Sequence, residues 1–431
     1  MKKQLLALLA LGLVLALAGC QKKEQAPASA GPNAPATVTV WAWDASTIIP
    51  WARLAGDIYM KDHPNVTVNV VDVPWNDVQQ KLITGFTSGQ TDGLPDVTYM
   101  QDNSMQKTII NYEKHLLPVD GKVDLSKFAR FKVALAEYNG KNYAVPGDNG
   151  TTATFIRKDI VEQAGLTVDQ FDNETWERFI ELGRIVKAKT GIALFSTDAT
   201  GPDFFSLMLQ SAGVYFYDAK GQPYLNNSPV LKRTMEVLIQ MYKDGTLILV
   251  PDWNGYVASI NNGQAAATVQ GCWVMGIIQS NPAQSGLWRV VHTPRFADPA
   301  LKSVNFSSQG GSGWMVLANS KNPDVTMDFL NKTFAGSVEV YGGIVHTGTI
   351  GTWLPGAEAP EYKQTSEFFG GEPVFQKIME YSAEVPMIKM GVYNYEARDA
   401  LVKAFMNTIN GADLQSALNE AQRSVEFLVN Q

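Results

Sequence analysis

The chain has 431 residues, a formal net charge of −7 and 45% hydrophobic residues, including 10 Trp and 15 Tyr. This length exceeds what one ordinary hydrophobic core supports, so it predicts two domains. A net acidic surface repels phosphate backbones, which excludes nucleic acid as an expected partner.

The first twenty residues have the pattern of an export signal. Lys2 and Lys3 give a positive start, residues 5–17 form an apolar run, and small residues precede Cys20. The apolar run is too short for a stable membrane-spanning helix. A cysteine directly after Leu-Ala-Gly resembles the lipobox of bacterial lipoproteins, in which that thiol is acylated and becomes the mature N-terminus. Residues 1–19 are therefore predicted to be a lipoprotein signal peptide, and the mature chain to be exported and lipid-anchored to the cell membrane, facing the periplasm or the cell exterior.

Residues 20–36 are rich in Pro, Ala and polar residues and lack apolar periodicity. They are predicted to form a flexible tether between the lipid and the folded part of the chain. If Cys20 carries lipid, Cys272 has no partner for a disulfide bond, because the sequence holds no other cysteine. Cys272 is predicted to be a buried thiol that packs as a small hydrophobe.

The first ordered region alternates strand and helix patterns. Three short segments alternate apolar and polar residues, and apolar residues recur at helical spacing in the two segments between them. The β-α-β-α-β order is typical of a parallel sheet, which binds ligands beyond the carboxyl ends of its strands. The predicted strands span residues 37–43, 66–70 and 96–100, and the predicted helices span residues 50–61 and 77–86.

Helix patterns dominate the rest of the chain. Thr175 and Ser228 are predicted N-caps of helices that end at Lys189 and Lys243. Two more helices are predicted at residues 201–210 and 324–334. The C-terminus is predicted to be a helical hairpin over residues 401–409 and 413–428, with Asp413 as a cap and one apolar face on each helix.

Several short motifs occur in a fixed order along the chain: Val38-Thr-Val-Trp-Ala-Trp43, Leu94-Pro-Asp-Val97, Tyr143-Ala-Val-Pro146, Phe155-Ile-Arg-Lys-Asp159, Thr175-Trp-Glu177, Asn262-Gly-Gln-Ala-Ala-Ala-Thr-Val-Gln-Gly-Cys-Trp273 and Tyr395-Glu-Ala-Arg398. Together they resemble the extracellular solute-binding proteins of ABC importers, in the sugar-binding, maltose-binding-like cluster (family 1). The resemblance covers about residues 37–430 and rests on the order and spacing of the motifs. Phe155-Ile156 departs from the usual Tyr-Asn or Tyr-Tyr at a position that supports the fold.

The resemblance implies an α/β, two-lobed fold of the periplasmic-binding-protein-like type II. Its hinged lobes have central mixed sheets, C-terminal helices pack across them, and the lobes close on a ligand like a clamp. The crossings between lobes would fall near residues 146–148 and 293–294, where Pro or Gly absorbs small changes in backbone angles. Lobe one would hold residues 37–147 with 295–345, lobe two residues 148–294, and the C-terminal segment residues 346–431.

A carbohydrate site needs carboxylates and amides for sugar hydroxyls, and flat aromatic rings for the C–H faces of the sugar. Trp273 resembles the family's stacking tryptophan in lobe two. The family's cleft aromatic corresponds to Tyr393 or Tyr395, and the spacing does not decide between them. The predicted ligand-binding residues are Trp43, Asp44, Asp102, Asn103, Asp148, Asn149, Asp203, Trp273, Gly310, Gly311, Tyr393 and Tyr395.

Most of these candidates also have a purely structural interpretation. Trp43 shares a strand face with Trp41 and would equally serve the core. The acids and amides, such as Asp44 and Asp148, are common helix caps and turn formers. The glycine pair at 310–311 allows a ligand to approach the backbone closely, and it also suits a tight turn.

Enzyme signatures do not occur in the sequence. The four histidines, His63, His115, His292 and His346, are widely spaced and lack a metal-ligand pattern. No Gly-x-Ser-x-Gly elbow, Walker A loop or dinucleotide fingerprint is present. No catalytic residue, cofactor or metal is therefore predicted, and the chain is not expected to be an enzyme.

The resemblance implies a receptor that binds a neutral carbohydrate, from mono- to oligosaccharide, in the inter-lobe cleft and delivers it to a membrane permease. The missing Walker A loop assigns ATP hydrolysis to a separate subunit. The expected partners are a small sugar, ABC permease subunits and the membrane through the lipid anchor, and the chain is expected to be a monomer. Two alternatives stay open: a binding protein for a polyamine or a metal, and a secreted glycoside hydrolase with paired carboxylates.

Overall fold

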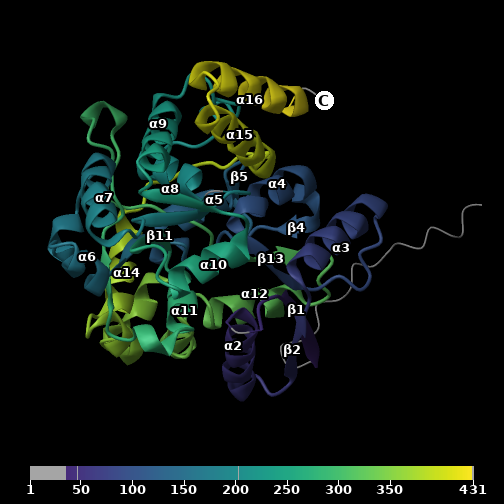
Figure 1. The fold of residues 1–431 in the computed structure, drawn as a ribbon. Coiled ribbons are helices and arrows are strands. Elements are labelled where there is room, and N and C mark those ends of the chain that lie inside the picture. The colour runs from purple at the N-terminus through teal and green to yellow at the C-terminus, as the bar shows by residue number, and fades with distance from the viewer. Residues whose placement is uncertain (1–34, 46, 202, 430–431) are drawn as a thin grey trace, which may run out of the picture. The chain divides into compact units, whose positions relative to one another are not determined.

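Figure 1 shows the computed structural model, which describes residues 35–45, 47–201 and 203–429. The predicted signal peptide, the lipidation site Cys20 and nearly all of the predicted tether lie outside the described residues. Strand β1 (Ala36–Ala42) begins one residue before the predicted start of order. From Ala36 onward the described chain is one compact unit of mixed α/β class, as predicted.

The first sheet joins β1 to strands from distant parts of the sequence. Its order is β2-β1-β3-β13-β4, and β7 also pairs with β13. The parallel pairing of β1 with β2 and β3 confirms the predicted β-α-β-α-β region, whereas β13 runs antiparallel to β3. The helices of this region are α2 (Ile48–Asp62) and α3 (Trp75–Ser88). The other strands of the sheet are β2 (Val66–Asp72), β3 (Val97–Gln101), β4 (Leu116–Leu117), β7 (Val145–Pro146) and β13 (Ser312–Leu317).

Strand β1 is covered on both faces, as its apolar composition requires for an inner strand. Val38 and Val40 belong to the same core cluster as Trp51 of α2. Trp41 belongs to a different core cluster, which includes Leu82 of α3. Because side chains alternate along a strand, neighbouring residues of β1 anchor helices on opposite faces of the sheet.

The second sheet has the order β11-β8-β12 with antiparallel pairing, and a separate parallel pair joins β9 to β10. Strand β8 contributes to two core clusters. Phe155 lies in the cluster that also contains Val38 and Val40 of the first sheet, whereas Ile156 lies in a second cluster, formed with the surrounding helices. The strands are β8 (Thr152–Arg157), β9 (Phe195–Asp198), β10 (Leu247–Val250), β11 (Ala267–Gly271) and β12 (Trp288–Val291).

The predicted helix caps are confirmed. The backbone N–H of Arg178 donates to Thr175 Oγ1 at 3.2 Å, and that of Leu231 donates to Ser228 Oγ at 3.2 Å. These caps open α7 (Trp176–Thr190) and α9 (Pro229–Lys243). The helix predicted from residue 201 begins later, since α8 spans Phe204–Ser211.

The C-terminal hairpin is also confirmed. It consists of α15 (Asn394–Ile409) and α16 (Leu414–Val429), which lie side by side in Figure 1. Asp413 caps the second helix, because its Oδ2 accepts from the backbone N–H of Ser416 at 2.8 Å. The remaining helices and strands are α4 (Asp102–Tyr112), α5 (Arg130–Leu135), α6 (Lys158–Gln163), α10 (Trp253–Asn261), α11 (Val274–Gln279), α12 (Pro323–Lys332), α13 (Val338–Gly342), α14 (Val374–Glu384), β5 (Glu137–Tyr138) and β6 (Lys141–Asn142). Short 3-10 helices span Glu113–His115, Leu125–Lys127, Val168–Phe171, Pro282–Gln284, Pro299–Leu301, Val345–Thr347, Leu354–Glu358, Pro360–Lys363 and Glu367–Phe369.

Segments that connect the two sheets run next to one another. The link from β7 to β8 spans residues 147–151, and the link from β12 to β13 spans residues 292–311. The backbone N–H of Gln309 donates to Gly150 O at 2.7 Å, which joins the two links. Both contain a predicted crossing.

The second link also contacts helix α8. Val304 N–H donates to Ser211 O at 2.9 Å, and Ser307 Oγ donates to Leu207 O at 2.6 Å. Residues 304–307 therefore pack with an element that the sequence assigned to lobe two, and the lobe boundary at 294/295 stays a prediction.

Replacement of Trp51 by alanine tests the core beneath the first sheet. The Trp51 side chain is fully buried and lies against the rings of Trp314, Phe334 and Tyr341. The cavity left by Trp51→Ala is expected to lower the free energy of unfolding by about 3–5 kcal/mol, measured by urea unfolding. Phe427→Ala is the control, because this ring is 68% exposed and its removal should change stability by about 0.5 kcal/mol or less. Equal losses in the two variants would contradict this account of the core.

Candidate functional site

A cavity with a volume of about 1030 Å³ is the largest of the three cavities described below. It lies beyond the carboxyl ends of β1 and β3, which is where a parallel sheet is expected to bind a ligand. A second wall comes from α10 and α11, which pack against each other, and α10 also packs against β9 and β10. The lining residues are Trp43, Asp44, Thr47, Ile48, Gln101, Asn103, Asp148, Trp253, Val257, Trp273, Gly276, Ile277, Ser280, Gly310, Gly311, Ser312, Thr347, Gly348 and Thr349.

Three tryptophans line this cavity. Trp43 comes from the end of β1, and its Nε1 donates to Tyr99 O at 3.2 Å. Trp253 and Trp273 come from the other wall, with ring centroids 5.6 Å apart. Trp253 is 41% exposed, which is unusual for so large an apolar ring and leaves its surface open to a ligand.

Trp273 is held in one orientation by its surroundings. Its Nε1 donates to the backbone oxygen of Gln309 at 2.9 Å. A Cβ at Gly271 would lie only 2.3 Å from that same nitrogen, so the indole fits only because residue 271 is glycine. The ring is therefore fixed by a hydrogen bond and by close packing before a ligand arrives.

Acidic groups line or support the wall formed by the first sheet. Asp148 lines the cavity, and its carboxylate accepts a hydrogen bond from Tyr99 Oη. Behind it, the fully buried Lys132 forms an ion pair with Asp102 and donates to Ser312 O at 3.1 Å. Burial raises the pKa of Asp148, and it raises the pKa of Asp102 to about 6, whereas the Lys132 ammonium lowers both.

A smaller cavity of about 210 Å³ adjoins the large one, because Trp253 lines both. Asp203 lines the small cavity, and its carboxylate accepts from Gln270 Nε2 at 2.7 Å and from Gln309 Nε2 at 2.6 Å. Burial raises the pKa of Asp203 to about 6. Arg398 of α15 also lines this cavity and brings a positive charge to it.

The structure brings most of the predicted site residues to these two cavities. Asp203 reaches the small cavity. Asp44 has a φ of 69° and accepts from Thr47 N–H at 3.2 Å, so it shapes a turn as well as lining the large cavity. The predicted residues that line the large cavity are Trp43, Asp44, Asn103, Asp148, Trp273, Gly310 and Gly311.

Four predicted residues line neither of these two cavities. Asp102 and Asn149 are buried behind the wall of the large cavity, and Asn149 Oδ1 accepts from Thr151 N–H at 2.6 Å. Tyr395 reaches the site indirectly, because its Oη donates at 3.2 Å to the Oε1 of Gln101, a lining residue. Tyr393 instead lies under the ammonium of Lys107, 5.6 Å from the ring centroid.

Sequence reasoning missed several lining residues. Gln101 is the last residue of β3, so its place beyond a predicted strand was a usable signal. Trp253 follows the cap residue Asp252 at the start of α10, where nothing in the local pattern separates a ligand contact from a core residue. Thr349 reaches the cavity from a segment with no regular periodicity.

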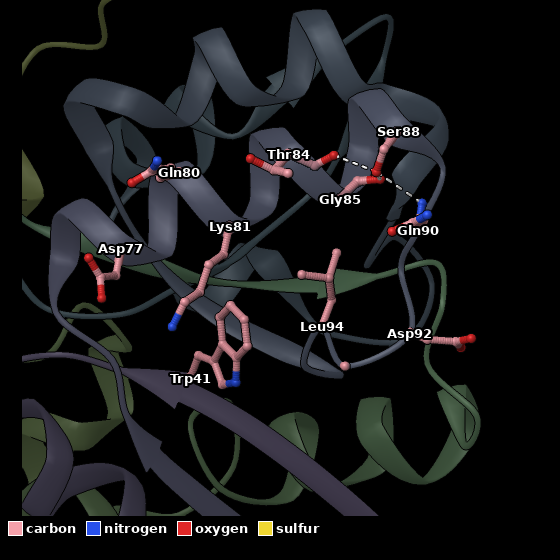
Figure 2. A pocket seen from close by; sticks show the side chains of 11 residues that line it. Trp41, Asp77, Gln80, Lys81, Thr84, Gly85, Ser88, Gln90, Asp92 and Leu94 are labelled. Carbon is pink, nitrogen blue, oxygen red and sulfur yellow. Dashed lines mark hydrogen bonds between the residues drawn. The ribbon is translucent and has the colours of Figure 1, made fainter.

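A separate cavity of about 600 Å³ lies against α3, as Figure 2 shows. Trp41 and Leu94 supply its apolar part, and the Lys81 ammonium lies 5.7 Å from the centroid of the Trp41 ring. Its polar residues come from one side of α3 and from the loop before β3. None of the predicted ligand-binding residues lines this cavity.

Cys272 is buried, as predicted, and its thiol donates to the backbone oxygen of Asn149 at 3.0 Å. Burial raises the pKa of this thiol, which keeps it protonated. Among residues 35–45, 47–201 and 203–429, no group of His, Cys, Asp and Glu side chains is arranged to hold a metal ion. Within the same ranges, no helix has the length and apolar character needed to cross a membrane.

The sequence is similar over most of its length to known binding proteins. The chain is 32% identical over 382 residues to the lactose-binding protein of Rhizobium radiobacter, covering 88% of this chain and 90% of the relative. It is 25% identical over 406 residues to the arabinooligosaccharide-binding protein of Bacillus subtilis (strain 168), covering 89% of each chain.

The fold comparison gives the same result. A crystal structure of an extracellular solute-binding protein of family 1 superposes with a TM-score of 0.77 at 20% identity, covering 90% of this chain and 100% of that one. This likeness confirms the predicted two-lobed fold. The family model for "bacterial extracellular solute-binding protein" matches residues 44–334. The chain therefore belongs to the bacterial extracellular solute-binding proteins, as its motifs predicted, and with them to the exported proteins.

Proposed function

We propose that this chain is the substrate-binding component of an ABC importer and that it captures a neutral carbohydrate in the large cavity. The observation that carries the proposal is the placement of Trp43 on one wall and of Trp253 and Trp273 on the other. Indole faces suit the C–H faces of sugar rings, and the amides and carboxylates between them suit hydroxyl groups. Relatives that bind lactose and arabinooligosaccharides support the same class of ligand.

The size of the cavity favours a ligand of more than one sugar ring. Its volume of about 1030 Å³ lies at the upper end of the range for small-molecule sites, which is about 300–1,000 Å³. The indoles on opposite walls would each contact a different part of such a ligand. A disaccharide or short oligosaccharide therefore fits the proposal better than a single ring.

Closure of the lobes on the sugar would make capture selective. A ligand shifts an equilibrium between open and closed forms only by binding one of them more tightly. Because the two walls carry different tryptophans, a sugar that touches both would favour the closed form. The closed receptor would then present the sugar to permease subunits, with a separate subunit hydrolysing ATP.

The remaining parts of the proposal concern the cell context. We infer that Cys20 carries the lipid anchor, that the receptor works as a monomer, and that it leaves its sugar chemically unchanged. The alternatives are a receptor for a cation such as a polyamine or metal, and a secreted glycoside hydrolase. Asp44 and Asp148 in the cavity are what a cation receptor would use, so the first experiment includes cations.

A ligand screen tests the proposed class directly. The protein produced without residues 1–20 is heated with lactose, galactobiose, arabinooligosaccharides, polyamines or metal salts. Binding to the folded state alone stabilises by mass action, by about 2.7 kcal/mol at a ligand concentration 100-fold above Kd. We expect a sugar to raise the unfolding midpoint and to be recovered intact by chromatography. A shift with cations alone, or cleavage of the sugar, would contradict the proposal.

Replacement of Trp273 tests the stacking role. Trp273→Ala removes a preorganised aromatic face, so it is expected to weaken sugar binding about 10-fold or more by isothermal titration calorimetry. Trp43→Ala on the opposite wall should act in the same direction. Tyr242→Ala on α9 is the control, since this exposed ring lines none of the cavities described above. Loss of folding in Trp273→Ala, checked by circular dichroism, would make Trp273 a core residue instead.

A further inference from the structure

A buried lysine lies directly behind the wall of the large cavity. Lys132 of α5 is 2% exposed, although a charged group is costly to bury without partners. Its Nζ pairs with Asp102 and donates to the backbone oxygen of Ser312, a cavity-lining residue. A Cβ at Gly311 would lie 2.8 Å from that Nζ, so the ammonium is separated from the cavity by the glycine backbone.

The ion pair with Lys132 occupies only one of the two carboxylate oxygens of Asp102. Asp102 Oδ2 accepts from Lys132, whereas Asp102 Oδ1 is buried with no hydrogen-bond partner among the described residues. The Lys132 ammonium therefore offsets the cost of burying the ionised Asp102 carboxylate. The second carboxyl group near the ammonium belongs to Asp148, which does line the cavity. The same Cβ at Gly311 that would lie 2.8 Å from Lys132 Nζ would lie 3.2 Å from the Asp148 backbone oxygen, so the two residues meet at this glycine.

Asp148 receives several contacts that fix its position. Tyr99 Oη donates to its carboxylate, and its own backbone N–H donates to Tyr99 Oη at 3.1 Å. Its backbone also forms a β-bridge with Gly351, two residues after the lining residue Thr349. The titratable and charged groups near it are Tyr99 of β3, Asp102 of α4, Lys132 of α5 and Cys272 before α11. Tyr362 lies behind Gly351, because its Oη accepts from Gly351 N–H at 3.2 Å.

We propose that Lys132 is a positioning residue of the carbohydrate site, whose buried charge keeps Asp148 ionised as an acceptor for sugar hydroxyls. This proposal rests on the proposed function, because it assigns Asp148 to the sugar. The positive charge of Lys132 offsets part of the cost of burying two carboxylates close together, so Asp148 can stay ionised and keep its strength as a hydrogen-bond acceptor. Lys132 acts from behind the wall and does not touch the ligand.

The direction of the effect follows from linkage. Hydroxyl groups bind the ionised carboxylate better, so affinity is lost as the pH falls through the pKa of Asp148. Burial raises that pKa and the Lys132 ammonium lowers it. Removal of the ammonium should move the midpoint of the affinity loss to higher pH, whereas removal of the negative charge of Asp102 should move it to lower pH.

Two variants with opposite expected shifts test the proposal. The sugar used is the one, among lactose, galactobiose and arabinooligosaccharides, that raises the thermal unfolding midpoint most. Its Kd is measured from pH 5 to 9 by tryptophan fluorescence. In Lys132→Met the pH at the midpoint of the affinity loss should rise by about one unit or more. The affinity at pH 7 should then be about 10-fold weaker and should recover at higher pH. In Asp102→Asn, which keeps an acceptor for Lys132, the midpoint should fall. Lys122→Met, at an exposed surface ion pair with Asp324, is the matched control and should leave the profile unchanged.

The possible results distinguish a failure of the positioning role of Lys132 from a failure of the proposed sugar-binding function. An even loss of affinity at every pH in Lys132→Met would show a purely structural role and overturn the positioning proposal. If Lys132→Met does not fold, the Asp102→Asn profile decides alone, and an unshifted midpoint there overturns the proposal as well. If the wild-type protein binds no sugar of the set, the proposed function fails first and the role of Lys132 falls with it.

Discussion

Backbone hydrogen bonds between three connecting segments hold the cavity walls together. Gln309 N–H donates to Gly150 O at 2.7 Å, and Asn149 N–H donates to Ile350 O at 2.6 Å. These bonds join segments that are separated by up to two hundred residues in the sequence. Because such bonds need close approach of the backbones, the lining residues Asp148, Gly310 and Thr349 meet at one place in the fold.

This packing imposes a requirement on the residues of the wall. At Gly311 the backbone has a φ of 94°, and a side chain there would collide with Lys132 and Asp102. At Gly271 a side chain would displace the indole of Trp273. The two glycines have different tasks, since one gives room to a buried charge and the other to an aromatic face.

The site combines fixed aromatic faces with a small amount of buried charge. Trp43 and Trp273 are each held by a hydrogen bond from the indole nitrogen to a backbone oxygen. Asp148 is held by Tyr99, and the charge of Lys132 balances part of the acidity behind the wall. Groups that are already oriented lose little entropy when a ligand binds, so such a rigid wall suits a binding site.

The sequence by itself determined the local elements and the family. Periodicity predicted β1, β2, β3 and their helices, and cap residues such as Thr175 and Ser228 predicted helix starts, because these features depend on neighbours within a few residues. The same reasoning located Trp43 and Asn103, since strand ends meet at one edge of a parallel sheet.

The tertiary structure decided which residues share the cavity and which lie behind it. Trp253 was not predicted, because its position depends on how α10 packs against the other wall. Asp102 was predicted as a ligand contact, yet the structure places it behind the wall, where it pairs with Lys132, thirty residues further along the chain. Local patterns carry no information on such pairs, because a long-range contact is set by the packing of whole elements rather than by the spacing of residues along one of them.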